Sequence, residues 1–178
     1  SLPEQNFLVT TMTPTGSEQV LQRLGDSVDH CYAPYDFTFA VGNFLRTTQP
    51  RMLVLMETEI WPNLIMQAKA QDIPVLLINA RMSERSARGY QRISWLSRPV
   101  LGAISHIACQ SAEHMQRFVD LGVDAEKVSV LGSVKYDLQL PERLLKQASL
   151  LKAQLNLRTR PVWIAASTHS GEEEQIIE

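Results

Sequence analysis

Short apolar runs alternate with longer stretches of helical periodicity along most of this sequence. Six such runs of three to five mostly apolar residues occur, at positions 7–10, 52–56, 75–78, 107–109, 128–131 and 162–165. Several are apolar at consecutive positions, which is typical of parallel strands that are covered on both faces. The alternation predicts an α/β fold, with a doubly wound parallel sheet and helices on both of its faces.

Helix-forming signals fill the intervals between these runs. The predicted helices extend from Ser17 to Leu24, from Pro62 to about Gln71, from Ser83 toward Leu96, from Ser111 to near Gly122 and from Pro141 to about Leu155. Serine and proline suit a helix start, because a hydroxyl oxygen accepts a backbone hydrogen bond and proline lacks an N–H that would stay unpaired. Gly25 is expected to end the first helix. Residues 156–161 are expected to be a linker into a further strand and helix.

The composition limits the classes of function. The chain has 178 residues, enough for about one domain, and its 17 basic and 19 acidic residues give a formal net charge of −2. This charge provides no general attraction to nucleic acid. The two cysteines, Cys31 and Cys109, form no spaced disulfide framework. No apolar run approaches the ~20 residues of a membrane-spanning helix. From the missing initiator methionine and an end inside a helical pattern, we expect part of a longer protein.

A hydroxyl-rich segment follows the first apolar run. Ligands of open α/β sheets bind beyond the carboxyl ends of the strands, so the residues after each run are the candidates for a site. Thr13, Thr15 and Gly16 lie in such a position, ahead of a helix whose first N–H groups could hold an anion. Ordinary turn and capping chemistry is the alternative. The segment is neither a Walker motif nor a dinucleotide-binding glycine turn.

Two carboxylates, Glu57 and Glu59, follow the second run and precede a predicted helix. One of them could act as a base or bind sugar hydroxyls. Acidic residues also occur at helix starts for structural reasons, since the helix dipole stabilises negative charge there. Trp61 could offer an apolar surface to a sugar, although a packed tryptophan is the commoner case.

Four arginines follow the third of these strand ends. Asn79 comes directly after the apolar run, and Arg81, Arg85, Arg88 and Arg92 follow at intervals of four, three and four, with Ser83 between the first two. Residues at this spacing share one face of a helix. A solvated face is one interpretation. The other, which we favour, is binding of phosphate or carboxylate, which a guanidinium engages through two parallel hydrogen bonds.

Two further segments are candidates for anion binding. Lys135 follows a Gly-Ser turn after the run at 128–131, and Ser167 and Thr168 precede the last predicted helix. Each signal is weak by itself. The four histidines show no metal-ligand spacing and no Gly-x-Ser-x-Gly elbow occurs, so we expect neither a metal site nor serine-hydrolase chemistry.

Seven segments occur in an order and at a spacing that match one known family. They are residues 11–17, 34–36, 56–63, 79–83, 86–90, 132–137 and 163–169, which include the sequences Glu-Thr-Glu-Ile-Trp-Pro and Asn-Ala-Arg-Met-Ser. Over nearly its whole length the chain resembles the bacterial 3-deoxy-D-manno-octulosonic acid (Kdo) transferases.

The resemblance implies a GT-B glycosyltransferase that transfers Kdo from CMP-Kdo to a lipid A precursor in lipopolysaccharide biosynthesis, at the cytoplasmic face of the bacterial inner membrane. Residues 1–157 would form most of the N-terminal, acceptor-binding Rossmann-like domain. Residues 158–178 would form the linker and the first strand and helix of the donor-binding domain. The family has an upstream N-terminal membrane anchor and a Ser-Val-Gly-Glu-like segment with the catalytic base. Neither occurs here, so this chain alone is expected to be soluble and inactive.

The resemblance also suggests roles for the candidate residues. Glu57 and Glu59 would orient the acceptor or assist the base, while Lys135 and an arginine would offset anionic charge. Substrate binding is expected from Thr13, Thr15, Gly16, Asn79, Arg81, Ser83, Arg85 and Arg88, and donor-phosphate binding from Ser167 and Thr168. No metal, cofactor or nucleic acid is expected. The alternatives are another GT-B nucleotide-sugar enzyme, such as an epimerase, and a non-catalytic flavodoxin-like binding module.

Overall fold

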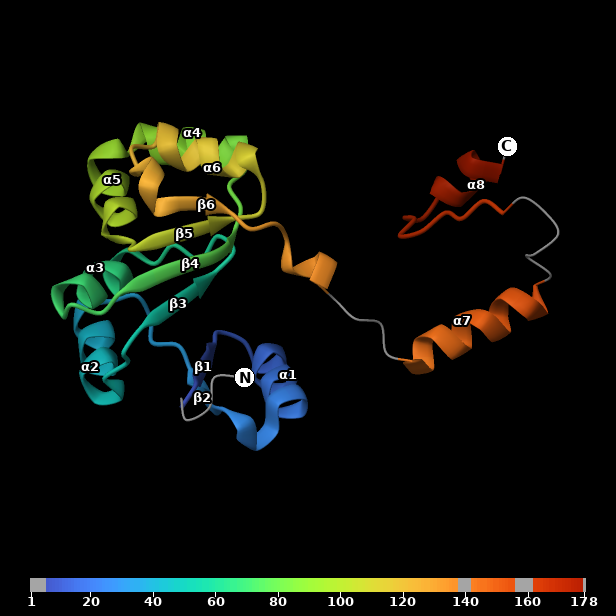
Figure 1. Cartoon of the computed structure of the whole chain (residues 1–178), viewed down its shortest axis with the longest axis horizontal. Coiled ribbons are helices and arrows are strands. Elements are labelled where there is room, and N and C mark those ends of the chain that lie inside the picture. Colours follow the sequence, from blue (N-terminus) through green and yellow to red (C-terminus); the bar gives the residue numbers. More distant parts are fainter. Residues whose placement is uncertain (1–5, 138–141, 156–161, 178) are drawn as a thin grey trace. The chain divides into compact units, whose positions relative to one another are not determined.

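The computed structural model describes residues 6–137, 142–155 and 162–177. The chain divides into two compact units, Ser1–Tyr136 and Asp137–Glu178 (Figure 1). The predicted boundary between residues 157 and 158 lies outside the described residues. Within the part that the structure describes, no helix is long and apolar enough to cross a membrane.

Strands and helices alternate throughout the first unit. Its strands are β1 (Leu8–Thr11), β2 (Asp29–Tyr32), β3 (Leu53–Met56), β4 (Val75–Ala80), β5 (His106–Cys109) and β6 (Val128–Val130). Its helices are α1 (Pro14–Leu24), α2 (Thr38–Thr48), α3 (Pro62–Ala70), α4 (Glu84–Arg92), α5 (Ser94–Ala103) and α6 (Ala112–Asp120). Short 3₁₀ turns occupy Gly25–Ser27, Ala125–Lys127 and Val134–Asp137. The second unit contains α7 (Glu142–Gln154) and α8 (Glu172–Ile177).

All described strand pairs are parallel, as the sequence predicts. They form two sheets: β1 pairs with β2, and the other four strands follow the order β3-β4-β5-β6. Because the strands of the larger sheet are parallel, their carboxyl ends share one edge. The segments after β3, β4, β5 and β6 therefore meet at that edge.

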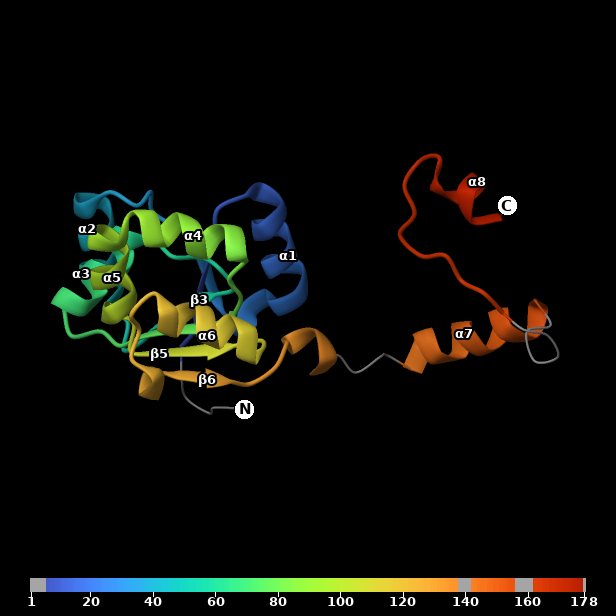
Figure 2. The ribbon, with the colours of Figure 1, turned by 90° about the horizontal axis from the view of Figure 1, so that it is seen from above.

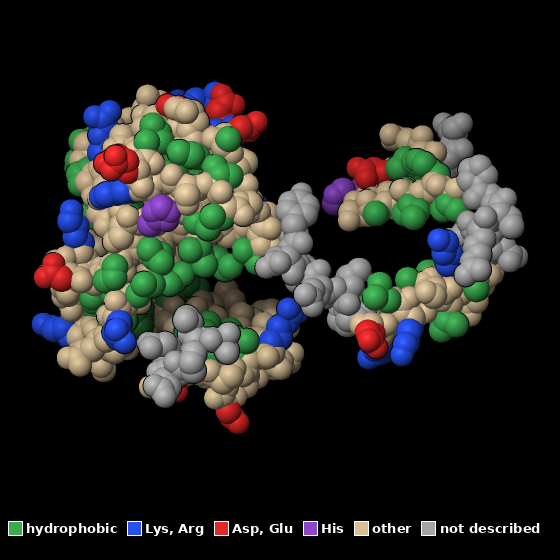
Figure 3. Space-filling view, viewed as in Figure 1, with side chains coloured by type: hydrophobic (Ala, Val, Ile, Leu, Met, Phe, Trp, Pro, Cys, Tyr) green, Lys and Arg blue, Asp and Glu red, His purple; other side chains and the backbone are tan. Residues whose placement is uncertain are grey.

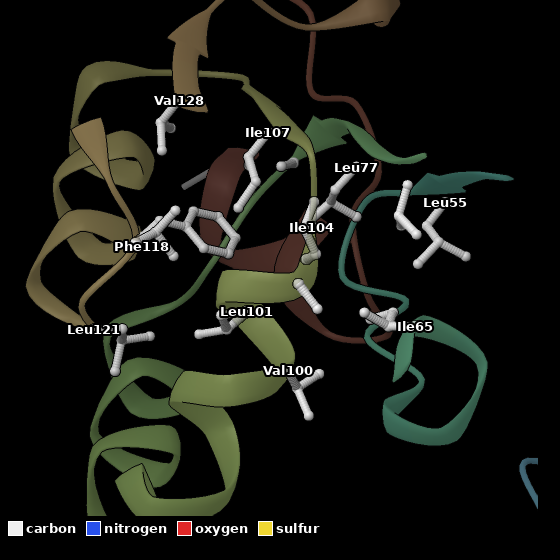
Figure 4. Close-up of a cluster of buried hydrophobic side chains, with 14 of the residues drawn as sticks. Leu55, Ile65, Leu77, Val100, Leu101, Ile104, Ile107, Phe118, Leu121 and Val128 are labelled. Carbon is white, nitrogen blue, oxygen red and sulfur yellow. The ribbon is translucent and has the colours of Figure 1, made fainter. Parts of the chain in front are cut away.

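The hydrophobic core lies between the larger sheet and its helices (Figure 4). Leu77, Ile107 and Phe118 are fully buried, and Ile65 of α3 and Leu101 of α5 pack into the same cluster. Strand and helix residues thus contribute to one core, which holds the carboxyl edge in place. In Figure 2, α4 and α6 lie on the same side of β5 and β6.

The opposite face of the larger sheet carries exposed apolar side chains. Val54 and Met56 of β3 are 50% and 48% exposed. Hydrophobic side chains gather over strands β3 to β6 in Figure 3. The alternation of Val54 and Met56 with the buried Leu55 shows that β3 is apolar on both faces and that the face with Val54 and Met56 is the more exposed one.

Several predicted elements differ from the observed ones. The helix expected from Ser83 toward Leu96 is two helices that meet at Ile93. The run at 162–165, which was predicted to be a strand, is not one, because no described strand of the second unit pairs with it. Strand β2 and helix α2 were not among the predicted elements, since β2 contains Asp29 and His30 and so lacks an apolar run.

Candidate functional site

The loop after β3 places Glu57 beside Arg81. The backbone of Glu57 has a φ of 62°, and its N–H donates to the Ile78 carbonyl at 2.9 Å, which fixes the residue to the end of β4. Its carboxylate oxygen Oε2 lies 3.0 Å from Nη2 of Arg81, and the two side chains are 39% and 53% exposed. An accessible ion pair therefore stands at the carboxyl edge, formed by two predicted site residues.

Glu59 has a different partner. Its Oε2 accepts a hydrogen bond of 2.7 Å from the indole Nε1 of Trp61. Trp61 occupies the N-cap position of α3 without capping it through its side chain. The observed contacts thus separate the two acids: Glu57 faces a guanidinium and Glu59 faces an indole.

Helix α3 is capped by Asp36, which comes from a loop before α2. One carboxylate oxygen accepts from the Asn63 N–H at 3.1 Å, and the other accepts from the Leu64 N–H at 2.8 Å. The Asn63 side chain in turn donates to the Asp36 carbonyl at 2.6 Å. Asp36, and not Glu57 or Glu59, is therefore the carboxylate that caps the start of α3.

Asn79 joins the ends of three neighbouring strands. It is 8% exposed and has a φ of 50°, a conformation that asparagine tolerates better than most residues. Its Oδ1 accepts from the Val134 N–H at 3.3 Å, and its carbonyl accepts from Nε2 of Gln110 at 3.0 Å. These contacts hold the segments after β5 and β6 against β4, so Asn79 supports the shape of the edge.

The arginines after β4 occupy unlike environments. Ser83 caps α4 by accepting the Ser86 N–H at 3.1 Å, as predicted. Arg88 pairs with Glu84 at 3.1 Å on the exposed helix surface. Arg85 is exposed and forms no ion pair within the described part of the chain. Of the arginines that follow β4, Arg81 is the one that pairs with Glu57 at the carboxyl edge.

Lys135 lies at a hollow that the sequence did not reveal. The hollow has a volume of about 390 Å³ and is lined by Gln110, Ser111, His114, Ser133 and Lys135, all of which follow β5 or β6. Ser111 caps α6, which confirms its predicted structural role. His114 is held by Met82: its Nδ1 lies 3.1 Å from the Met82 carbonyl, which also accepts from Arg117 at 2.8 Å. Position after a strand end was the signal that could have identified Gln110 and Ser111.

Thr13, Thr15 and Gly16 belong to the start of α1, beside the smaller sheet. Thr13, and not the predicted Ser17, is the N-cap residue, because its Oγ1 accepts the Gly16 N–H at 3.1 Å. A Cβ on Gly16 would lie 3.1 Å from that oxygen and 3.3 Å from the Thr11 Cβ. Across the described residues, no hydrogen bond or ion pair links this turn to Glu57 or Arg81.

Ser167 and Thr168 belong to the second unit. Ser167 has a φ of 60°, and the Thr168 hydroxyl donates to Oε1 of Glu173 at 2.6 Å. This hydrogen bond lowers the pKa of the Glu173 carboxyl. The hydroxyl of Thr168 is thus engaged at the start of α8.

The groups at the edge have the chemistry to bind anions and hydroxyl groups. The edge combines an accessible Glu57–Arg81 pair with a hollow lined by Lys135, His114 and hydroxyl groups. In the regions that the structure covers, no three His, Cys, Asp or Glu residues cluster as metal ligands would.

Sequence comparisons identify longer relatives. Residues 1–138 match the family described as 3-Deoxy-D-manno-octulosonic-acid transferase (kdotransferase). The 3-deoxy-D-manno-octulosonic acid transferase of Haemophilus influenzae is 43% identical over 175 residues, which are 98% of this chain and 41% of that protein. A bifunctional glycosyltransferase/methyltransferase of Fusobacterium nucleatum is 31% identical over 180 residues, which are 100% of this chain and 28% of that protein. The chain spans less than half the length of either relative.

A solved structure shares the fold. The UDP-GlcNAc 2-epimerase of Neisseria meningitidis, bound to UDP-GlcNAc, superposes with a TM-score of 0.53 and 15% identity. The match covers 80% of this chain and 45% of the epimerase. It supports the predicted Rossmann-like architecture of a GT-B-like domain and concerns the fold alone.

Proposed function

This chain belongs to the 3-deoxy-D-manno-octulosonic-acid transferase family, and from that premise we propose that its parent protein transfers Kdo from CMP-Kdo to a lipid A precursor. The acceptor would lie at the carboxyl edge of the larger sheet. The parent would work at the cytoplasmic face of the bacterial inner membrane, in lipopolysaccharide biosynthesis. The observation that carries the placement is the accessible pair between Glu57 and Arg81.

The reaction sets the demands on the edge. An acceptor hydroxyl attacks the anomeric carbon of Kdo, the bond from that carbon to the CMP phosphate breaks, and CMP leaves with the electron pair. A base must take the hydroxyl proton, and cations must offset the charge of phosphate and carboxylate groups. Correct placement of the two reacting atoms lowers the barrier further.

Glu57 suits the positioning of an acceptor hydroxyl. Arg81 holds one carboxylate oxygen, so the carboxylate has a defined orientation, and the side chain remains accessible to solvent. Glu59 would contribute through Trp61, whose indole it orients. We place the catalytic base in the parent outside this chain, so both acids assist that base.

The cationic and polar groups would receive the anionic parts of the substrates. Lys135 at its hollow and Arg81 beside Glu57 would face phosphate or carboxylate groups. Asn79 and Ser83 would contribute indirectly, because their side chains hold the backbone of Val134 and of the start of α4 in place. Arg85 and Arg88 would extend the basic surface, and Thr13, Thr15 and Gly16 would border the acceptor region. Ser167 and Thr168 would face the donor phosphate from the second domain of the parent.

The Glu57→Gln and Glu59→Gln variants of the full-length parent test this proposal. Each should lower kcat/KM by on the order of 10² or more, because acid–base assistance typically contributes ~10²–10⁴-fold. The melting temperature should change little, since Asp36 and not these acids caps α3. Rates within about threefold of the native parent for both variants would show that the acids are not functional.

The chain by itself provides the second test. We expect no Kdo transfer when it is incubated with CMP-Kdo and a lipid A precursor, because the base and most of the donor-binding domain would be missing. The full-length parent in the same assay is the positive control. Turnover by this chain would place the catalytic base within residues 1–178.

A further inference from the structure

The hollow at Lys135 has a polar lining that comes from two segments of the chain. Gln110, Ser111 and His114 follow β5, and Ser133 and Lys135 follow β6. None of these lining residues is acidic, and Lys135 forms no ion pair within the described part of the chain. The hollow thus has a positive charge that no described carboxylate offsets.

The contacts of His114 decide which of its ring nitrogens carries the proton. The Met82 N–H lies 3.3 Å from Nδ1, and Nη1 of Arg117 lies 3.2 Å from the same atom. The Met82 carbonyl, 3.1 Å from Nδ1, already accepts from Arg117 at 2.8 Å. A proton on Nδ1 would leave the Met82 N–H without an acceptor among the described residues, which costs free energy. Nδ1 is therefore the acceptor, and the neutral ring carries its proton on Nε2 as a hydrogen-bond donor.

Two hydroxyl groups add further donors to the hollow. Oγ of Ser111 accepts from the His114 N–H, and Oγ of Ser133 accepts from the Lys135 N–H, each at 3.4 Å. Both hydroxyl protons remain available, because a hydroxyl that accepts one hydrogen bond can still donate another. Nε2 of Gln110 donates to a backbone carbonyl at the end of β4, so its Oε1 is left as an acceptor. The hollow therefore combines an ammonium group, an imidazole N–H and two hydroxyls with one amide oxygen.

We propose that this hollow binds the phosphate monoester of a sugar phosphate. Such a group has three acceptor oxygens and a charge close to −2, which match several donors and a lysine. A carboxylate has two oxygens and a single charge, so it would leave more of the donors unpaired. The volume of about 390 Å³ leaves room for a sugar beside the phosphate, and Oε1 of Gln110 can accept from a sugar hydroxyl. The inference deepens the proposed function and rests on it for the source of the phosphate, which is the acceptor.

Nuclear magnetic resonance of the 178-residue chain with ¹⁵N-labelled histidine tests the inference. At about pH 8, where an ordinary histidine is neutral, the nitrogen shifts of His114 should show the proton on Nε2. Inorganic phosphate and glucose 1-phosphate should each move the His114 signals saturably, and acetate at equal ionic strength should move them less. The spectrum of His114→Gln identifies these signals by their loss. The signals of His30 and His106, which do not line the hollow, should stay in place.

Variants of the lining assign the binding to named groups. Lys135→Met should weaken phosphate binding by on the order of tenfold or more, because a charge-assisted hydrogen bond is lost. Ser133→Ala should weaken it by about threefold, as expected for one neutral hydrogen bond. Lys69→Met is the matched control, since Lys69 is exposed in the last turn of α3 and does not line the hollow. We expect this control to bind phosphate like the native chain. Unchanged His106 signals confirm that each variant is folded.

Four results would overturn the proposal. They are the lack of a saturable shift with phosphate, equal binding of acetate and phosphate, equal losses in Lys135→Met and Lys69→Met, and a proton on Nδ1 of His114 in the free chain. Cytidine monophosphate that binds more tightly than glucose 1-phosphate would show instead that the hollow receives the nucleotide. All these measurements detect binding by a chain that we expect to be inactive. Their failure is therefore distinct from failure of the proposed transfer reaction.

Discussion

Individual residues with left-handed backbone conformations shape the carboxyl edge. Glu57 and Asn79 both have positive φ angles, and both are bound to neighbouring strands through hydrogen bonds. Such conformations cost free energy for residues other than glycine and persist where the surroundings hold them. In Glu57 the conformation turns the chain directly after β3 and sets the carboxylate beside Arg81. The backbone conformation of Glu57 thus determines the position of its carboxylate.

Cys109 provides a prediction of pH dependence at the same scale. Burial raises the pKa of its thiol from 9.0 to about 11, because the thiolate would lose its hydration. The protonated thiol is favoured in the folded state. The stability contribution is therefore fully present below pH 9 and decreases as the pH rises toward 11, by at most about 1.4 kcal/mol per pH unit.

Urea unfolding of the native chain and of Cys109→Ala between pH 8 and about 11 measures this effect. The difference in unfolding free energy between the two proteins should shrink as the pH rises. Burial also raises the pKa of Tyr90, but that group is present in both proteins and cancels in the difference. A difference that stays constant with pH would show that the Cys109 thiol titrates as in the unfolded chain.

Among the elements, α3 depends on a contact from another part of the chain. Its first N–H groups are bound by the Asp36 carboxylate, whereas α4 and α6 are capped by Ser83 and Ser111 from within their own segments. The loop after β3 leads into α3, so the cap also positions Trp61 and, through it, Glu59. Asp36 lies in residues 34–36, one of the seven segments that match the family. The sequence by itself indicated no role for this residue.

Removal of this carboxylate should destabilise the first unit. Asp36→Ala is expected to cost about 1–2 kcal/mol in urea unfolding, the usual range for a lost helix cap, and Asp36→Asn should cost less because it keeps one acceptor oxygen. Asp26→Ala is the control, since this exposed carboxylate has no hydrogen-bond partner in the described regions. Equal losses for Asp36→Ala and Asp26→Ala would refute the capping role.

At the scale of the whole molecule, the described hydrophobic core lies within the first unit. Every residue of the hydrophobic cluster lies between Val41 and Val128, and α7 buries none of its side chains. Burial of apolar surface is the main favourable contribution to folding. Residues 137–178 should therefore add little to the stability of the first unit.

A chain of residues 1–136 tests this expectation. It should unfold cooperatively with a melting temperature within about 3 °C of the 178-residue chain, a difference that corresponds to about 1 kcal/mol for a protein of this size. Calorimetry of both chains at equal concentration provides the measurement. Loss of the cooperative transition, or a much lower melting temperature, would show that the second unit contributes to the core.

The sequence by itself determined the features that depend on neighbouring residues. The apolar runs located five of the six described strands, and the parallel α/β class followed from their alternation with helices. Ser83, Ser111 and Pro62 were correctly placed at helix starts, and Gly25 at a helix end. These features could be predicted because a cap or a strand pattern involves residues only a few positions apart.

Only the tertiary structure decided the contacts between distant segments. It paired Glu57 with Arg81, brought Asp36 to α3 and Val134 to Asn79, and placed Lys135 at a hollow with His114. It also divided the strands into two sheets and left the run at 162–165 unpaired. Residues separated by 21 to 55 positions leave no periodic signal in the chain. Strand order and packing in the core bring such residues together.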